Sequence, residues 1–357
     1  MHCKGHVTFE ALMKTLTLLA VAAAGAVLAG GACANDTMAT LGTGGLVFLT
    51  SQDIEMTSED LFLSPDEVRV TYEFTNSGAD DQQVLVAFPM PDIEGSGDFM
   101  VSVPTEDPEN IFGFETTFNG EPVEATLHQY AFAFGIEHTD RLKALGVPLI
   151  PYSQATSDAL NGLSDEQKAE LLHLGLVIPM EYDAGQGMVT DYTPIWTLRS
   201  TYSWEAMFPA GETVEVAHSY RPSVGGTVAV TFLAPPYEDY DPATTYAQTY
   251  CTDEGFLNAV RKTLANPDEL YSAPFTESWL SYIWSTGANW SGPIKRFHLT
   301  IDKGRPENLV SFCWDGEVTK TSPTTFEMEA TDFYPPWDRE LEILILNKQE
   351  PMEGSAG

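Results

Sequence analysis

The sequence predicts a mostly β protein with two β-sandwich-like units, the first carrying a helical insertion and the second opened by one helix. Apolar side chains alternate with polar ones at the two-residue period of strands over many short segments. Turn-forming residues separate these segments. Hydrophobic residues make up 43% of the 357 residues, which is enough to build a core. A chain of this length favours roughly two domains, and we place them at residues 35–234 and 235–357.

The strands of the first unit are identified by their alternation. Residues 67–75 place four apolar side chains on one face, namely Val68, Val70, Tyr72 and Phe74. The Asn119-Gly120 pair tolerates positive φ at both positions and so predicts a type I′ hairpin. Pro209-Ala210-Gly211 predicts a further turn. The other strands are expected at residues 83–88, 112–118, 123–127, 196–204, 213–220 and 228–233.

The pattern becomes helical between residues 130 and 193. Ser164 and Gln167 have the spacing of a capping box, and Gly175 predicts the end of that helix. Thr139 opens a shorter helix that is expected to stop at Gly146. We therefore expect a helical insertion, residues 130–193, on the rim of the first sandwich.

The second unit follows a linker rich in Pro, Tyr and acidic residues at 235–242. An amphipathic helix is predicted over residues 253–265. Asp315-Gly316 predicts a hairpin turn between two of the later strands. These strands are expected at residues 294–301, 309–314, 317–320, 326–330 and 341–346.

The N-terminus has the pattern of a secretory signal peptide, residues 1–34. Met13-Lys14 precedes an uncharged apolar run, and Ala32-Cys33-Ala34 supplies the small residues for cleavage after Ala34. The true start is then expected at Met13. Two alternatives remain open, a lipoprotein anchored through Cys33 and an uncleaved membrane anchor. The expected location is the periplasm or the exterior, with a soluble chain after cleavage.

The formal charge of −35 excludes a class of partner. A chain this acidic is repelled by phosphate backbones, so nucleic acids are not expected partners. Cleavage after Ala34 leaves Cys251 and Cys313 as the only cysteines, and in an exported protein we expect them to form a disulfide. The alternative is two separate buried thiols.

No assembled catalytic motif is present in the sequence. It has no G-x-S-x-G elbow and no H-E-x-x-H helix, and none of the histidines after Ala34 are paired at i,i+4 as metal ligands would be. His218 and His298, which fall in predicted strands, are interpreted as structural groups. Glu238, Asp239 and Asp241 are the best candidate ligands for Ca²⁺, although a solvated loop is the simpler reading. No other cofactor is expected.

Aromatic residues are dense in the second half, where most are expected to pack in the core. Trp290 is flanked by polar and Gly residues, so we predict it to be the exposed ring, with Asn289 beside it in a candidate binding site.

Several short stretches occur together in this chain. They are Asn35-Asp36-Thr37-Met38-Ala39 leading to Gly44-Gly45-Leu46-Val47-Phe48, Ile54-Glu55-Met56-x-Ser58-Glu59-Asp60-Leu61, Phe88-Pro89-Met90-Pro91-Asp92-Ile93, Phe208-Pro209-Ala210-Gly211-Glu212, Asn289-Trp290-x-Gly292-Pro293-Ile294 and Ser311-Phe312-Cys313. Over essentially the whole mature chain they resemble an exported bacterial family known only as domain of unknown function 4424. That resemblance implies no activity and assigns no catalytic residue.

A weaker likeness concerns the first unit. Its motifs are a strand ending at Asn76, Phe88-Pro89-Met90-Pro91, Phe118-Asn119-Gly120-Glu121-Pro122-Val123 and Pro209-x-Gly211-Glu212-x-Val214 before Tyr220. Their order is similar to that of the vault/inter-alpha-trypsin-inhibitor domain. That resemblance implies a β-sandwich used in extracellular interaction.

The function expected from these observations is a non-enzymatic binding or structural module of the envelope, with an envelope protein or glycan as partner. The alternative is a carboxylate-dependent hydrolase of envelope glycans or peptides.

Overall fold

The computed structural model describes residues 35–349, except for residues 43–44, 98–99, 106, 184, 186, 238–239 and 265–272. The expected signal peptide, residues 1–34, and the alternative start at Met13 lie outside the described residues and stay predictions. No helix of the described part is long and apolar enough to cross a membrane.

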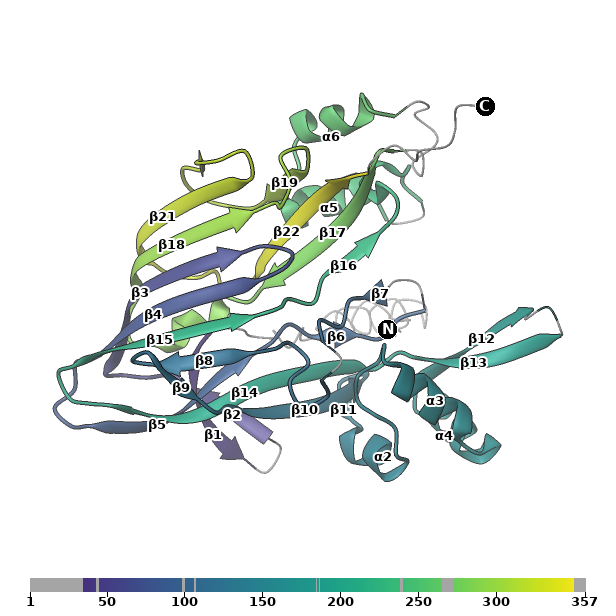
Figure 1. Ribbon diagram of the computed structural model, residues 1–357, viewed down its shortest axis with the longest axis horizontal. Helices are drawn as coiled ribbons and strands as arrows, with labels where there is room; N and C mark the ends of the chain where they lie inside the picture. The colour runs from purple at the N-terminus through teal and green to yellow at the C-terminus, as the bar shows by residue number, and fades with distance from the viewer. Residues whose placement is uncertain are drawn as a thin grey trace, which may run out of the picture. The chain divides into compact units, whose positions relative to one another are not determined.

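An eight-stranded sheet forms the middle of the fold (Figure 1). All its neighbouring strands are antiparallel except β3 and β18, which pair in parallel. Its strands in spatial order are β20 (Thr319–Lys320), β21 (Thr325–Phe333), β18 (Ile294–Asp302), β3 (Ile54–Leu63), β4 (Val68–Asn76), β15 (Thr213–Tyr220), β8 (Glu115–Phe118) and β9 (Glu121–Val123).

Three further sheets complete the β structure. The seven-stranded sheet contains β11 (Ile136–Glu137), β10 (Thr126–Ala133), β14 (Thr197–Phe208), β5 (Gln82–Pro89), β1 (Thr37–Gly42) and β2 (Gly45–Leu49), with β6 (Ile93–Glu94) paired to β14. The five-stranded sheet contains β19 (Leu309–Phe312), β22 (Leu341–Lys348), β17 (Phe275–Tyr282), β16 (Gly225–Thr227) and β7 (Met100–Val101). The last is a two-stranded ribbon of β12 (Val177–Asp183) and β13 (Met188–Pro194).

The inner face of the eight-stranded sheet is covered by both larger neighbours. The predicted alternation along β4 is confirmed, because its four inward side chains are at most 1% exposed. Phe74 packs edge-on against Phe208 of β14, with ring centroids 5.9 Å apart. The Tyr72 hydroxyl lies 3.2 Å from that of Tyr282 on β17. The mostly β, sandwich-like fold expected from the sequence is therefore confirmed.

Helices occupy the connections between strands. They are α2 (Thr139–Ala144), α3 (Gln154–Gly162), α4 (Asp165–His173), α5 (Pro242–Tyr250) and α6 (Glu254–Arg261), with 3₁₀ turns η1 (Thr231–Leu233) and η3 (Ser285–Asn289). The capping box of α4 is confirmed, since Gln167 N–H donates to Ser164 Oγ and Ser164 N–H donates to Gln167 Oε1. Gly175 follows with a φ of +66°, the left-handed conformation typical of a helix stop.

The insertion expected at residues 130–193 is only partly helical. Its start lies inside β10, which pairs with β14 over seven residues, and its end is the β12–β13 ribbon. The capping signals identified the helices correctly. The flanking strands were missed. Strand β10 pairs with β14, far along the chain, whereas β12 and β13 pair with each other as a local hairpin.

Two further local predictions are wrong. The strand expected at 228–233 is replaced by η1, and Val228 is 70% exposed. The Asp315-Gly316 hairpin does not form either, because β19 pairs with β22 while β20 pairs with β21 in another sheet. Strand β19 thus pairs with β22, far along the chain, rather than with its sequence neighbour β20.

Strands from both sides of residue 235 share the eight-stranded sheet, since β18 lies next to β3 and β21 lies on the other side of β18. The predicted boundary falls between η1 and α5. Around that point lies a smaller second core, formed by Val230, Phe232, Tyr246, Leu257, Val260, Phe275, Leu344 and Leu346.

Candidate functional site: a buried polar core

The first two described residues, Asn35 and Asp36, lie in the interior with no exposed surface. Polar side chains from five other elements surround them. We call this group the polar core; its members are Asn35, Asp36, Glu59, Tyr72, His218, Tyr282 and Thr286.

Strand register explains how distant residues meet there. Glu59 on β3 lies opposite Tyr72 on β4, so both side chains project from the same face of the sheet. His218 on β15 lies opposite Val70, the inward neighbour of Tyr72 along β4. Tyr282 ends β17 and approaches from the five-stranded sheet.

Asn35 is held by hydrogen bonds on every side. Its backbone N–H donates to Thr286 Oγ1 over 2.7 Å, and the Thr286 hydroxyl lies 2.7 Å from the Asn35 carbonyl oxygen. Its side-chain Nδ2 donates to Glu59 Oε2 over 3.2 Å. Its Oδ1 accepts from the Tyr72 hydroxyl. The start of the described chain is therefore fixed in one position.

Asp36 is paired with His218. The His218 Nε2 atom lies 3.0 Å from Asp36 Oδ1, and neither side chain has exposed surface. Aromatic rings enclose the imidazole, with centroids between 4.8 and 5.7 Å away; they belong to Phe88, Phe114, Trp204 and Tyr72. The pair is thus shielded from water.

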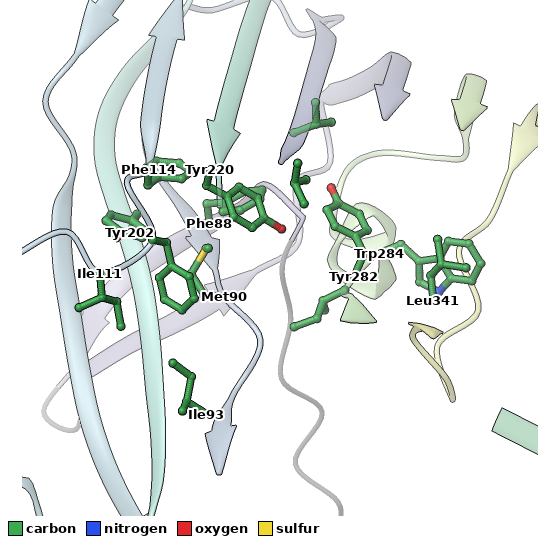
Figure 2. Close-up of a cluster of buried hydrophobic side chains, with 14 of the residues drawn as sticks. Phe88, Met90, Ile93, Ile111, Phe114, Tyr202, Tyr220, Tyr282, Trp284 and Leu341 are labelled. Atoms are coloured by element: carbon green, nitrogen blue, oxygen red, sulfur yellow. The ribbon is translucent and has the colours of Figure 1, made fainter. Parts of the chain in front are cut away.

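Several polar atoms of this region have no hydrogen-bond partner among the described residues. They are Asp36 Oδ2, Glu59 Oε1, His218 Nδ1, Trp204 Nε1 and the Tyr220 hydroxyl. Figure 2 shows the Tyr220 and Tyr282 hydroxyls pointing toward one another from two different sheets. Because such atoms are costly to bury unpaired, their gathering in one place makes this region a candidate functional site.

Burial sets the protonation of the two carboxyl groups. Burial raises the pKa of Glu59 to about 8 and is the largest influence on that group. The hydrogen bond from Asn35 acts in the opposite direction and lowers this pKa. Burial also raises the pKa of Asp36, while the nearby His218 acts in the opposite direction. The same cause raises the pKa of both tyrosines, Tyr72 and Tyr282, well above the usual value. Among the described residues, no Lys or Arg forms an ion pair with Asp36 or Glu59.

The exposure predicted for Trp290 is wrong. Its ring is 2% exposed and packs on Phe74 with centroids 4.5 Å apart. Trp290 Nε1 donates to the Asp36 carbonyl over 2.6 Å, and Asn289 Nδ2 donates to Thr37 Oγ1 over 3.0 Å. Both residues thus contact Asp36 and Thr37, and a role in ligand binding stays a prediction.

Only one of the three candidate Ca²⁺ ligands, Asp241, lies among the described residues. Glu238 and Asp239 lie outside the described residues. Asp241 precedes α5, where its Oδ2 accepts from Thr244 Oγ1 over 2.6 Å. Within the described ranges, no three His, Cys, Asp or Glu side chains are grouped as metal ligands. A calcium site stays a prediction.

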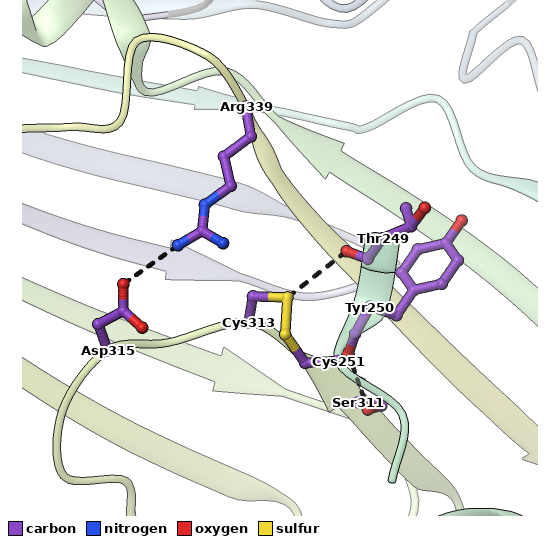
Figure 3. Close-up of a disulfide and its surroundings, with 7 residues drawn as sticks. All are labelled: Thr249, Tyr250, Cys251, Ser311, Cys313, Asp315 and Arg339. Carbon is purple, nitrogen blue, oxygen red and sulfur yellow. Dashed lines mark hydrogen bonds and ion pairs between the residues drawn. A yellow bond between two sulfur atoms is a disulfide. The ribbon is translucent and has the colours of Figure 1, made fainter. Parts of the chain in front are cut away.

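The predicted disulfide is present and joins Cys251 to Cys313 (Figure 3). It ties the end of α5 to the residue following β19. Ser311 Oγ donates to the Tyr250 carbonyl over 2.9 Å, which adds a second link beside it.

Comparison with protein families gives one match. A family model described as a domain of unknown function, DUF4424, matches residues 34–344. The chain belongs to the DUF4424 family. The search of curated proteins gave no match. The weaker likeness of this DUF4424 chain to the vault/inter-alpha-trypsin-inhibitor domain is not confirmed.

One solved structure similar to the DUF4424 chain is a provisionally named nutrient-binding protein from Legionella pneumophila. The similarity covers 88% of this chain and 70% of that one, with 13% identity and a TM-score of 0.43. A likeness this distant carries no argument about function.

The polar core is the element that the sequence did not predict. His218 was interpreted as a lone structural histidine, and Asp36 and Glu59 were not separated from the other acidic residues. A signal was present nonetheless: three of the stretches that resemble DUF4424 contribute Asn35-Asp36, Glu59 and Asn289-Trp290, which meet at this one place.

Proposed function

We propose that this DUF4424 protein is exported and acts as a non-enzymatic binding module of the envelope, with the β12–β13 ribbon as its contact surface. The observation that carries the proposal is the exposed apolar face of that ribbon. In Figure 1 the ribbon extends beyond the sheets next to α3 and α4.

The ribbon gathers apolar side chains on one of its faces. Tyr182 lies directly opposite Val189, and Met180 follows on the same face opposite Asp191. The exposed fraction is 47% for Tyr182, 37% for Val189 and 42% for Met180. An apolar group of this kind on a polar surface is typical of a contact with another protein.

The backbone of the ribbon supports the same interpretation. Among the described strands, β12 and β13 pair only with each other, so each has a second edge without a strand partner. Such an edge can bind an extended segment by strand addition, with side chains giving specificity. An extended segment of another envelope protein is therefore the proposed partner.

Export is supported by two observations. The Cys251–Cys313 disulfide is typical of oxidising compartments. The apolar run before Ala32-Cys33-Ala34 is typical of a secretory signal peptide.

Site-specific photo-cross-linking in the native cells tests the proposal. A photoreactive residue replaces Val189 on the ribbon or, as a matched control, the similarly exposed Val318 near β20. We expect one discrete protein adduct from position 189 and none from position 318. Serine at Met180 and Tyr182 should abolish that adduct without changing Tm. Equal adducts at both positions, an adduct with a second copy of this chain, or no adduct would reject the proposed partner.

The hydrolase alternative stays a prediction, and no geometry of the described residues favours it. An envelope glycan as partner stays a prediction as well.

A further inference from the structure

Asn35, Asp36 and Thr37 lie buried in the interior rather than on the surface. A Cβ atom on Gly287 would lie 2.7 Å from Asn35 Nδ2, so a glycine is needed where Asn35 packs against η3. Trp290 and Asn289 then hold Asp36 and Thr37 by hydrogen bonds. This loop therefore clamps three consecutive residues at the beginning of β1.

The charges around Asn35 are unbalanced. Two fully buried carboxyl groups, Asp36 and Glu59, share the region, and His218 is the basic partner of Asp36 alone. One oxygen of each carboxyl group, Asp36 Oδ2 and Glu59 Oε1, has no hydrogen-bond donor among the described residues. Buried carboxyl groups either stay protonated or pair with a cation, so a cation beside these two oxygens would stabilise both in their charged form.

Besides His218, the backbone nitrogen of Asn35 is a candidate source of a cation within the polar core. As a peptide N–H it offers a single hydrogen, which it donates to Thr286 Oγ1. As a chain terminus it would be an ammonium group with three donors. Two of these donors are then free for Asp36 Oδ2, on the adjoining residue, and for Glu59 Oε1, whose other oxygen already binds the Asn35 side chain.

We propose that Asn35 is the first residue of the functional protein and that its α-ammonium group is the buried counter-ion of Asp36 and Glu59. The inference rests on the proposed export, because a signal peptidase must expose this nitrogen. Hydrolysis of the Ala34–Asn35 peptide bond places the oxygen of water on Ala34, which becomes a carboxylate. Both hydrogens of water go to the nitrogen of Asn35, which becomes the ammonium group. Cleavage of the signal peptide would then also create the cation that pairs with Asp36 and Glu59 in the polar core.

A thermodynamic cycle tests this pairing. Two versions of the chain are prepared, one beginning at Asn35 and one retaining Ala34 behind a blocked terminus, each with Glu59 or with Glu59→Gln. In the chain that begins at Asn35, Glu59→Gln should lower Tm by about 5–10 °C, because a buried ion pair is broken. In the chain that retains Ala34, Glu59→Gln should leave Tm unchanged or raise Tm, because the substitution removes a carboxyl group that has no cationic partner. Equal shifts in both versions would overturn the inference.

A matched control is Glu55→Gln, on the same strand but only partly buried. We expect the same small shift of Tm in both versions of the chain. A difference between them as large as that for Glu59 would also overturn the inference, because the coupling would then not be specific to the polar core.

Two measurements on the unaltered protein do not depend on any variant folding. The protein isolated from its own cells should have the mass of a chain that begins at Asn35. An amine-reactive reagent should label the α-amino group at least about tenfold more slowly in the native state than in urea, because the group is buried. A chain that begins at an acylated Cys33, a retained leader, or rapid native labelling would overturn the inference. None of these results bears on the cross-link at Val189, so the two proposals fail separately.

Discussion

The Nε2 atom of His218 lies 3.0 Å from Oδ1 of Asp36, although 182 residues separate them in the chain. Both side chains are completely buried, which sets this pair apart from the surface ion pairs. The protein has a second His–Asp pair, His298 Nδ1 with Asp60 Oδ2 at 3.2 Å, whose carboxyl group is half-exposed. The two pairs allow a direct comparison of the same chemistry in two environments.

Replacing His218 by phenylalanine should strongly destabilise the protein. The aromatic neighbours accept another ring, but Asp36 loses its partner, and breaking a buried pair costs about 3–5 kcal/mol. His298→Phe should cost less than about 1 kcal/mol, because water can solvate Asp60. Urea unfolding of both variants checks this, and equal losses would contradict a special role for the buried pair.

Gly287→Ala should lower the free energy of unfolding by about 1–3 kcal/mol, because the added methyl group meets Asn35 Nδ2 at 2.7 Å. Gly162→Ala is the control, since a Cβ there meets nothing within 4 Å. The control should be neutral or slightly stabilising in urea unfolding. A neutral Gly287→Ala would mean that the start of the chain is not clamped as described.

Removing both cysteines should lower the free energy of unfolding by about 4 kcal/mol in the chain-entropy model, since the disulfide closes a loop of 62 residues. Thermal unfolding with and without reductant measures the effect. The Cys251→Ser/Cys313→Ser double variant should not respond to reductant. A response there would show that the reductant acts elsewhere.

The chain that retains Ala34 should become less stable as the pH rises. Its Glu59 has a folded-state pKa of about 8, above the ordinary 4.5, so the folded state binds this proton more tightly. The contribution is complete below about pH 4.5 and is lost as the pH rises through about 8.

Other groups of the polar core belong in that pH measurement. The pKa of Asp36 is also raised, so this group changes stability with pH in the same direction as Glu59, and His218 faces it. The pKa values of Tyr72 and Tyr282 are raised well above the usual value, so both tyrosines stay protonated between pH 4 and 9. The difference between Glu59 and Glu59→Gln in unfolding from pH 4 to 9 isolates the carboxyl group. A difference that does not change with pH would rule out its titration.

The sequence predicts features whose cause is local. Alternation along β4, the Ser164–Gln167 capping box and the positive φ angles at Asn119 and Gly120 depend on neighbouring residues, and all three are confirmed. The disulfide was predictable for a different reason, because cleavage after Ala34 would leave only two cysteines.

Features whose cause is distant were not predictable in this way. Strands β19 and β20 are close in the sequence but belong to different sheets, which turn chemistry at Asp315-Gly316 does not specify. Trp290 was expected on the surface because its neighbours are polar or Gly, yet Phe74 and Asp36 cover it from remote segments. With 52 acidic residues, the two carboxyl groups of the polar core could not be singled out before their burial was known.

The hydrogen bond between Asn35 and Thr286 joins residues 251 positions apart. Strand β3 has its parallel partner in β18, which is synthesised much later. Strands β1 and β3 therefore find one partner at once, in β2 and β4, but β3 leaves the ribosome long before β18, with one sheet edge open until then. A chaperone that shields such edges should consequently affect the yield of this protein more than its final stability.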